Sequence, residues 1–222
     1  MDFRRSFWRK WWNGTHSKLM ETKISKDIWE KWPSRFKANF FNSLGGLKCV
    51  GLLSTMNSNG IANSGVFSQV VHIGSSPPTW GFLFRPPTIA HQSYENLMRN
   101  SYFNFSLATE FISLEILHQC SANYSNEISE LDIHNIKWNL DKQFNVPILL
   151  NADIQFIFKK IGSHSMSNGT LLVEAEVIEV ISNVSPEKDG FMNIAEKKII
   201  SSQGLNAYAE TNSIRRFDYA NP

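Results

Sequence analysis

A short polar stretch around a glycine is the first place in this sequence where side chains could hold a ligand. Asn63, Ser64 and Ser68 carry amide and hydroxyl groups, and Gly65 between them has no side chain to keep a ligand away from the backbone. Further along the chain stands Arg85, whose guanidinium can clamp an anion with two parallel hydrogen bonds.

Three more polar residues, Thr88, His91 and Ser93, stand at the expected beginning of a helix. A helix N-terminus presents free N–H groups and the positive end of the helix dipole, and both favour a phosphate. Together with the polar stretch, these residues predict a site for a phosphorylated planar ligand. They fit an N-cap, a turn and a solvated arginine without any ligand equally well, and spacing alone does not separate the two interpretations.

Motifs of the common catalytic and cofactor-binding classes are missing. The sequence contains no G-x-G-x-x-G, no Walker loop, no G-x-S-x-G and no H-E-x-x-H. His72 falls within an expected strand, and His118 and His134 flank a polar stretch without an obvious carboxylate or cysteine partner. We therefore predict no metal site and assign no catalytic side chain.

The composition limits the class of protein. Of 222 residues, 42% are hydrophobic and 19% are charged, which is typical of a folded domain. The net charge of +2 is too small to indicate a nucleic-acid partner. Two isolated cysteines, Cys49 and Cys120, indicate a reducing compartment. We recognise no signal peptide and no apolar run that would span a membrane, and so expect a cytoplasmic protein.

The beginning of the chain differs from the rest in charge. Residues 1–40 hold ten Lys and Arg against four Asp and Glu, and residues 1–34 are also rich in Trp. Such a segment could touch an anionic membrane surface. We favour a terminal extension whose aromatic residues pack on the body or on a second subunit, because Asn13-Gly14 interrupts any helix there. The predicted organisation is an extension over 1–34 and one domain over 35–222.

From residue 47 onward the pattern predicts short strands joined by hairpins. Asn59-Gly60 between two apolar runs is a strong hairpin signal, and a second hairpin is expected around residues 165–169. The expected helices cover residues 25–32, 34–44, 88–100, with Thr88 as N-cap, and 110–124. The expected strands cover residues 47–56, 61–73, 79–84, 102–108 and the two halves of 152–182. Residues 123–142 are expected to be irregular. This order favours a mainly β fold, an antiparallel barrel with a few flanking helices.

The order of several short motifs resembles a known family. The motifs are N-S-x-x-F-S, an S-x-P-P turn, G-F-x-x-R-P and T-x-x-x-x-S-Y-E-N, followed by HQCSANYSNEISELD, DGFMNI and GLNAYA. In this order and spacing they resemble the flavin reductase-like family, the FMN-binding split-barrel proteins that include flavoredoxins. The resemblance runs from about residue 35 to the C-terminus.

The resemblance implies a homodimeric split barrel with FMN near the subunit interface. By position it implies FMN contacts from Ser54 and Thr55 beside the flavin, from Asn63, Ser64, Phe67 and Ser68 on the ring and ribityl chain, from Arg85, Thr88, His91 and Ser93 on the phosphate, and from a loop with Ser121 and Ala122. The sequence departs from the family pattern at His91 and Ser93, where Arg and Thr are usual, and at Asn206 and Ala209. Neutral histidine is a poorer anion partner than arginine, so His91 weakens the expected clamp.

The implied activity is hydride transfer from NAD(P)H to flavin. The cofactor carries this chemistry, so no catalytic side chain is required. Two alternatives stay open. One is a flavoredoxin-type electron-transfer protein without its own NAD(P)H activity, whose basic extension would dock on an acidic partner. The other is a split-barrel protein for another planar ligand, such as haem or pyridoxal phosphate.

Overall fold

The computed structural model describes residues 23–86 and 91–220, and the chain divides into two units, residues 1–38 and 39–222. Most of the basic, Trp-rich segment, residues 1–22, lies outside the described residues. Helix α2 (Lys26–Trp29) begins after Ser25, as predicted, although the Ser25 hydroxyl bonds to the Asp27 side chain instead of capping the helix. Helix α3 (Ser34–Leu44) ends before Gly45-Gly46, also as predicted. The domain boundary after residue 34 stays a prediction.

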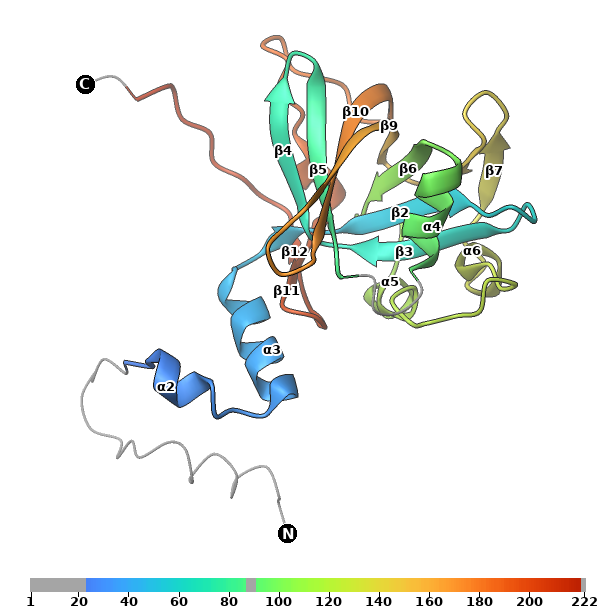
Figure 1. The fold of residues 1–222 in the computed structure, drawn as a ribbon. Helices are drawn as coiled ribbons and strands as arrows, with labels where there is room; N and C mark the ends of the chain where they lie inside the picture. Colours follow the sequence, from blue (N-terminus) through green and yellow to red (C-terminus); the bar gives the residue numbers. More distant parts are fainter. Residues whose placement is uncertain (1–22, 87–90, 221–222) are drawn as a thin grey trace. The chain divides into compact units, whose positions relative to one another are not determined.

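Seven antiparallel strands form the main sheet of the second unit, in the order β3-β2-β6-β9-β10-β5-β4 (Figure 1). Their bounds are β2 (Gly51–Met56), β3 (Ala62–Phe67), β4 (Val70–Ser75), β5 (Pro78–Phe84), β6 (Tyr102–Leu107), β9 (Ile154–Ser165) and β10 (Leu171–Ser182). The two edge strands, β3 and β4, are neighbours in the chain, and only Ser68 and Gln69 lie between them. The sheet therefore curls into a barrel that is split between β3 and β4, which confirms the predicted fold class.

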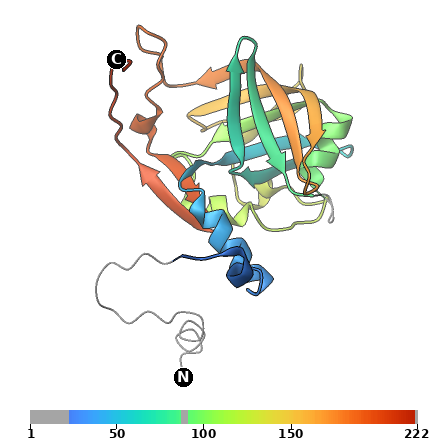
Figure 2. The same ribbon diagram turned by 60° about the vertical axis from the view of Figure 1, so that its left-hand side comes forward.

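Smaller elements surround this barrel. A three-stranded sheet has the order β1-β11-β12, and β7 pairs with β8. The bounds are β1 (Lys48–Cys49), β7 (Trp138–Asp141), β8 (Val146–Leu149), β11 (Ile199–Gln203), β12 (Ala207–Thr211), α4 (Gln92–Arg99), α5 (Leu114–Gln119), α6 (Glu130–Ile133) and the 3-10 helix η1 (Ile194–Lys197). Figures 1 and 2 show β4, β5, β9 and β10 running steeply across β2, β3 and β6.

Both predicted hairpins are confirmed. At the turn between β2 and β3, the Asn57 side-chain oxygen accepts hydrogen bonds from the backbone N–H groups of Asn59 and Ile61, each at 2.9 Å. Gly60 has a φ of 74°, which favours glycine at this position. The long strands β9 and β10 are joined in the same antiparallel manner, with Ser165 opposite Leu171.

Two predicted elements need correction near the split. The single return strand expected over 61–73 is two strands, β3 and β4, because the chain leaves its partner β2 at Ser68 and Gln69 and then pairs with β5. The helix expected from Thr88 begins at Gln92, with His91 as its N-cap residue, and His91 makes no side-chain capping bond. Thr88 itself lies outside the described residues.

The region after β6 is also more structured than predicted. The helix expected over 110–124 is only α5, because Ser113 caps its start by accepting a hydrogen bond from the Ile116 N–H at 3.3 Å. At its other end, the Ser121 hydroxyl donates to the His118 carbonyl at 2.6 Å, a local bond that competes with further helix. The segment 123–142, expected to be irregular, contains α6 and β7.

Strand β2 is buried along its whole length because it separates two hydrophobic clusters. On one side, Leu53 joins an aromatic barrel interior that includes Phe82, Phe103 and Phe158. On the other side, Leu52 joins a cluster that includes Leu117 of α5. This explains why the sequence of β2 is continuously apolar before its small-polar end, where a strand with one wet face would alternate. No described helix is long and apolar enough to cross a membrane.

Candidate functional site

A cavity of about 430 Å³ opens where the barrel is split. Its walls come from the end of β3, the Ser68-Gln69 link, the end of β5, the start of α4 and the loop that follows α5. Small-molecule sites in proteins have volumes of about 300–1,000 Å³, so the cavity is large enough for a ligand. Segments that are far apart in the sequence meet here because the edge strand β3 and the end of β5 line the same cavity as the start of α4.

Most of the predicted site residues meet at this cavity. Those that line it are Asn63, Phe67, Ser68, Arg85, His91, Ser93, Ser121 and Ala122. Ser54, Thr55 and Ser64 do not line it, and each is at most 2% exposed. Thr88 cannot be placed, since it lies outside the described residues.

The alternation of side chains along a strand explains this difference for Ser54 and Ser64. Successive residues of β3 point to opposite faces, so Asn63, Gly65 and Phe67 share the face of the cavity, and Ser64 points the other way. The Ser64 hydroxyl forms a buried hydrogen bond with the Ser54 hydroxyl at 2.8 Å across the β2–β3 pair. Ser64 reaches the site only through its backbone N–H. Thr55, opposite Asn63, is instead covered by Asn96, which donates to its hydroxyl at 3.0 Å.

Gly65 leaves space on the floor of the cavity. A Cβ atom added there would lie 3.5 Å from the Ser93 hydroxyl and 3.9 Å from the Phe67 ring, and would therefore occupy space that is now open. Because these are ordinary contact distances, the fold does not require glycine at this position. The absence of a side chain serves the cavity.

The start of α4 and the end of β5 provide the groups suited to an anion. Arg85 is exposed at the rim, and His91 and Ser93 lie half-buried at the first turn of the helix. The Ser93 hydroxyl donates to the Asn63 side-chain oxygen at 2.8 Å. An arginine and a helix N-terminus that line one cavity are both suited to a phosphate.

A buried carboxylate, which the sequence did not point out, is part of the same cavity. Glu130 of α6 is 3% exposed, and it accepts hydrogen bonds from the Ser64 backbone N–H at 2.9 Å and from the Asn63 amide at 3.1 Å. Burial raises the pKa of this carboxyl, and the hydrogen bonds from Ser64 and Asn63 oppose the rise. The sequence offered only a weak indication of Glu130. Ser129 is a typical N-cap residue and could have marked the start of α6, but the surrounding segment has no regular pattern.

Two of the other lining residues that were not predicted, Gln92 and Cys120, have contacts or a charge state that bear on the site. Gln92 accepts a hydrogen bond from the Asn63 amide at 2.8 Å and donates to the Tyr124 carbonyl at 2.7 Å, so it connects β3 to the loop after α5. The Cys120 thiol also lines the cavity, and burial, with the nearby Glu130 charge, raises its pKa to about 12. This thiol is therefore protonated and unreactive at neutral pH.

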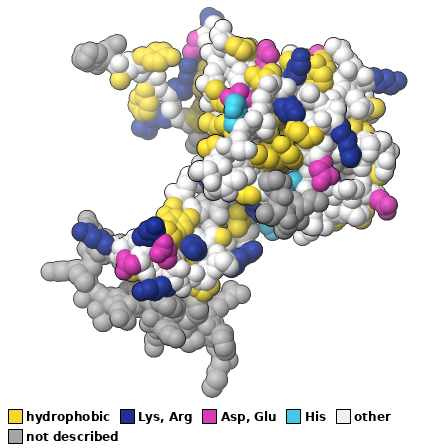
Figure 3. All heavy atoms as spheres, viewed as in Figure 1, with side chains coloured by type: hydrophobic (Ala, Val, Ile, Leu, Met, Phe, Trp, Pro, Cys, Tyr) yellow, Lys and Arg dark blue, Asp and Glu magenta, His cyan; other side chains and the backbone are white. Residues whose placement is uncertain are grey.

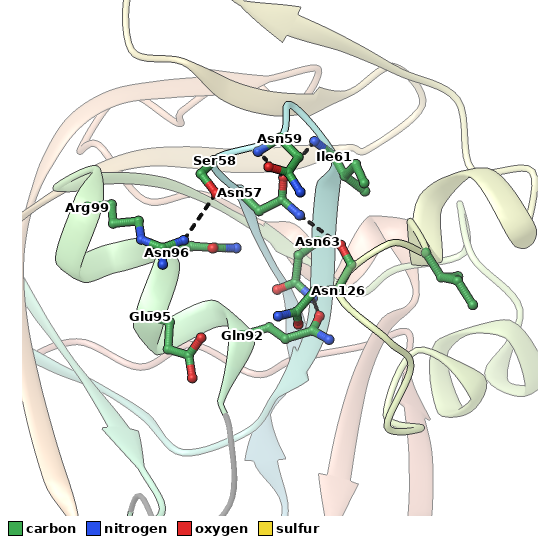
Figure 4. Close-up of a pocket in the computed structure, with 11 residues that line it drawn as sticks. Asn57, Ser58, Asn59, Ile61, Asn63, Gln92, Glu95, Asn96, Arg99 and Asn126 are labelled. Atoms are coloured by element: carbon green, nitrogen blue, oxygen red, sulfur yellow. Dashed lines mark hydrogen bonds between the residues drawn. The ribbon is translucent and has the colours of Figure 1, made fainter.

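A second, smaller cavity shares Asn63 and Gln92 with the first (Figure 4). Figure 4 shows Asn96 and Arg99 of α4 on the side of the turn between β2 and β3, with Arg99 bonded to Ser58 at 3.3 Å, and Gln92 beside Asn63. Its volume of about 80 Å³ is well below the range of small-molecule sites, about 300 Å³ and above. We therefore assign ligand binding to the larger cavity.

Metal binding finds no support in the part of the chain that the structure describes. No three His, Cys, Asp or Glu side chains are grouped there so as to hold an ion. The two histidines near the loop after α5 have other partners: His118 bonds to the Tyr208 hydroxyl and His134 to the Tyr124 hydroxyl, both at 3.1 Å.

Comparison with known proteins gives a consistent result. The family model described as "Flavin reductase like domain" matches residues 48–195. No curated protein matches the chain significantly. Among solved structures, a split barrel protein from Shewanella frigidimarina NCIMB 400, with a provisional assignment as a flavin reductase, has a TM-score of 0.83 and 27% identity, and the alignment covers 90% of this chain and 100% of that one.

Two more distant structures share the fold. Flavoredoxin of Desulfovibrio vulgaris (Miyazaki F) has a TM-score of 0.67 at 12% identity, with 78% of this chain and 92% of that chain covered. An FMN-binding protein from Thermus thermophilus has a TM-score of 0.61 at 12% identity, with 90% of this chain and 99% of that chain covered.

Proposed function

Because the chain belongs to the flavin reductase like domain family, we propose that it binds FMN in the cavity at the split of the barrel and acts as an NAD(P)H:flavin oxidoreductase. The observation that carries this proposal is the cavity itself, about 430 Å³ in volume, lined by Arg85, by the start of α4 and by polar residues at the edge of β3. Its volume lies within the range of about 300–1,000 Å³ for small-molecule sites.

The residues at the cavity suit the parts of FMN. Phe67 and Phe84 offer aromatic surface for a planar ring. Ser68 offers a hydroxyl after β3, and Asn63, whose amide is bonded to Glu130, Gln92 and Ser93, forms part of the polar wall. Arg85 would bind the phosphate beside the start of α4, and His91 would add a weaker contact because neutral imidazole carries no charge.

FMN, when bound, supplies the chemistry of accepting a hydride from a nicotinamide and releasing electrons. The side chains of this protein would bind and orient the ring and exclude water from the covered part of it. The Cys120 thiol would not compete as a nucleophile, since its pKa of about 12 keeps it protonated. The absence of a catalytic acid or base among the predicted residues is consistent with this division of roles.

Flavin binding is tested first. Protein purified without added flavin is denatured, and the released ligand is compared with FMN by chromatography; flavin-free protein is titrated with FMN while its fluorescence is followed. We expect co-elution with FMN or saturable quenching of FMN fluorescence. A colourless protein that does not bind added FMN would overturn the proposal.

Reductase activity is tested next, by mixing the FMN-loaded protein with NADH and with NADPH without oxygen. We expect one nucleotide to bleach the flavin absorbance. If neither does, the reductase proposal is wrong, and the flavoredoxin-type alternative, in which another protein supplies the electrons, replaces it.

We also propose that the protein is a homodimer. Val71 and Ile73 of the edge strand β4 are 49% and 48% exposed, and together with Leu172 they cover Gly81 on the outer face of the sheet. Figure 3 shows hydrophobic side chains exposed on the face of the molecule that is seen in Figure 1. An exposed apolar patch of this kind is typical of a protein interface.

Light scattering coupled to size-exclusion chromatography tests this arrangement. We expect the mass of a dimer for the wild type and of a monomer for Ile73→Lys, because burying a lysine charge in an apolar contact is costly. Ile214→Lys, at a residue that is also 48% exposed but lies outside the barrel strands, should stay dimeric. A monomeric wild type would contradict the proposal.

A further inference from the structure

Glu130 is buried beside the free edge of β3. Because Ser54 and Ser64 are opposite each other and the Ser64 N–H bonds to Glu130, this N–H points away from β2, toward the side of β3 that has no partner strand. The carboxylate replaces the missing strand at that point. It also lines the cavity, so it connects the edge of the sheet to the ligand site.

Within the described residues, the Glu130 side chain is hydrogen-bonded to donors. One oxygen accepts from the Ser64 N–H at 2.9 Å and the other from the Asn63 amide at 3.1 Å. A protonated carboxyl would accept these hydrogen bonds less well. The arrangement therefore favours the ionised form and opposes the rise in pKa that burial causes.

Asn63 is held in one orientation by this contact. Its amide nitrogen donates to Glu130 and to Gln92, while its oxygen accepts from the Ser93 hydroxyl at 2.8 Å. If the amide were reversed, its oxygen would face the oxygens of Glu130 and Gln92. The orientation of Asn63 in turn determines where the single hydroxyl hydrogen of Ser93 points.

We propose that Glu130 is a positioning residue for the ligand of this cavity: its carboxylate fixes Asn63 and, through Asn63, the start of α4, and its charge opposes reduction of a bound flavin. This inference rests on the proposed binding of FMN. The other ionisable groups at the cavity are Arg85, His91, Tyr124 and Cys120. Cys120 is neutral, and Arg85 lies at the exposed rim, so Glu130 is the buried charge.

The substitution Glu130→Gln keeps the shape of the side chain, removes its charge and replaces one hydrogen-bond acceptor by a donor. Glutamine fills the same volume, but its amide nitrogen must face either the Asn63 amide or the Ser64 N–H, both of which are donors. We expect FMN affinity to fall roughly tenfold, since a buried donor loses its acceptor. We also expect the midpoint potential of bound FMN to rise, because a negative charge beside it is removed.

The exchange variant Asn63→Asp with Glu130→Gln restores the contacts with Ser64 and Ser93 and moves the charge by one contact. The introduced glutamine would accept from the Ser64 N–H and donate to the introduced aspartate, and this aspartate would also accept from the Ser93 hydroxyl. Gln92 would have to reverse its amide to donate to the aspartate, and would give up its hydrogen bond to the Tyr124 carbonyl. We expect FMN affinity within about threefold of the wild type and a potential that returns toward the wild-type value. Glu127→Gln, an exposed carboxylate in the same loop that lines neither cavity, is the matched control.

The outcomes separate this inference from the proposed function. A wild type without FMN affinity overturns the proposed function and the inference with it. A wild type that binds FMN, together with a Glu130→Gln variant of unchanged affinity and potential, overturns the inference alone. Should Glu130→Gln fail to fold, the exchange variant decides: FMN affinity near the wild-type value supports the inference, and a folded exchange variant without FMN affinity overturns it.

Discussion

Arg85 is the residue on which phosphate recognition at the cavity would depend. It is exposed at the end of β5 and lines the same cavity as the start of α4, so its contribution should be specific to an anionic ligand. We expect Arg85→Ala to weaken FMN binding by about tenfold or more and riboflavin binding by less than about twofold, as measured by fluorescence titration.

The matched control for Arg85 is Arg99→Ala. Arg99 belongs to α4 but lines only the smaller cavity and bonds to Ser58. It should leave both affinities unchanged. Equal losses for FMN and riboflavin in Arg85→Ala would show that Arg85 does not contact the phosphate.

For Gly65 we predict a different effect, because its lack of a side chain leaves space in the cavity. The substitution Gly65→Ala adds a methyl group about one contact distance from Ser93 and Phe67, without a clash and without a positive φ. The free energy of unfolding should stay the same or rise by about 0.5 kcal/mol, because alanine restricts the unfolded chain. FMN affinity should fall severalfold, because the methyl group occupies the cavity.

Gly74→Ala is the control for Gly65. Gly74 lies in β4, outside the cavity, and an added Cβ there would also meet no close atom, the nearest being 4.0 Å away. Its FMN affinity should equal that of the wild type. If Gly65→Ala bound FMN normally, the ligand would not approach β3 at this residue.

At the scale of elements, Asp153 connects parts of the barrel that are distant in sequence. Its carboxylate accepts from the Thr109 hydroxyl after β6 at 2.6 Å and from the Asn183 amide after β10 at 2.8 Å, and Lys197 of η1 lies 3.4 Å away. Burial alone would raise the pKa of this carboxyl, but the hydrogen bonds and the Lys197 charge outweigh it, and the pKa is lowered.

This lowered pKa predicts the sign of a pH effect on stability. The unfolded chain takes up a proton at Asp153 before the folded protein does, so the stabilisation is complete above the ordinary aspartate pKa and is lost as pH falls through the lower, folded value. We expect Asp153→Asn to reduce the free energy of unfolding at neutral pH by about 2–3 kcal/mol and to lose less stability on acidification.

Urea unfolding at neutral and acidic pH measures both effects of Asp153→Asn. Asp218→Asn, an exposed aspartate near the C-terminus, serves as control and should change neither. An unchanged denaturation midpoint for Asp153→Asn would show that these connections do not stabilise the barrel.

Local pattern predicted the elements whose partners are close in the sequence. The Asn59-Gly60 hairpin and the long β9–β10 hairpin were both correct, because turn chemistry and strand pattern agree there. The break at Ser68 and Gln69 was missed, since the residues on either side continue to look like one strand. It arises from barrel closure, which depends on β4 pairing with β5.

The candidate site was also predictable where it depends on local pattern, and not where it depends on contacts between distant parts of the chain. The cavity-facing residues of β3 follow from the motif and its alternation, whereas Ser54 and Ser64 were included although alternation turns them away from the cavity. Glu130 is 66 residues away from the N–H it accepts from, and only the packing of α6 against the free edge of β3 brings them together.

For the whole molecule, charge and fold are unevenly distributed along the chain. Residues 1–40 carry ten Lys and Arg and four Asp and Glu, while the chain as a whole has a net charge of only +2. The family match begins at residue 48, and the residues that line the cavity lie between 63 and 130. The basic segment is therefore separate in sequence from everything that would bind FMN.

We expect a protein that lacks residues 1–24 to bind FMN with unchanged affinity and to keep the mass of the full-length protein's oligomer, less the deleted residues. The reason is that the deletion removes no cavity residue and no strand of the barrel. Fluorescence titration and light scattering, with the full-length protein as control, measure the two properties. Loss of FMN affinity or of the dimer would show that the basic segment is part of the site or of the subunit contact, and would contradict its assignment as an accessory extension.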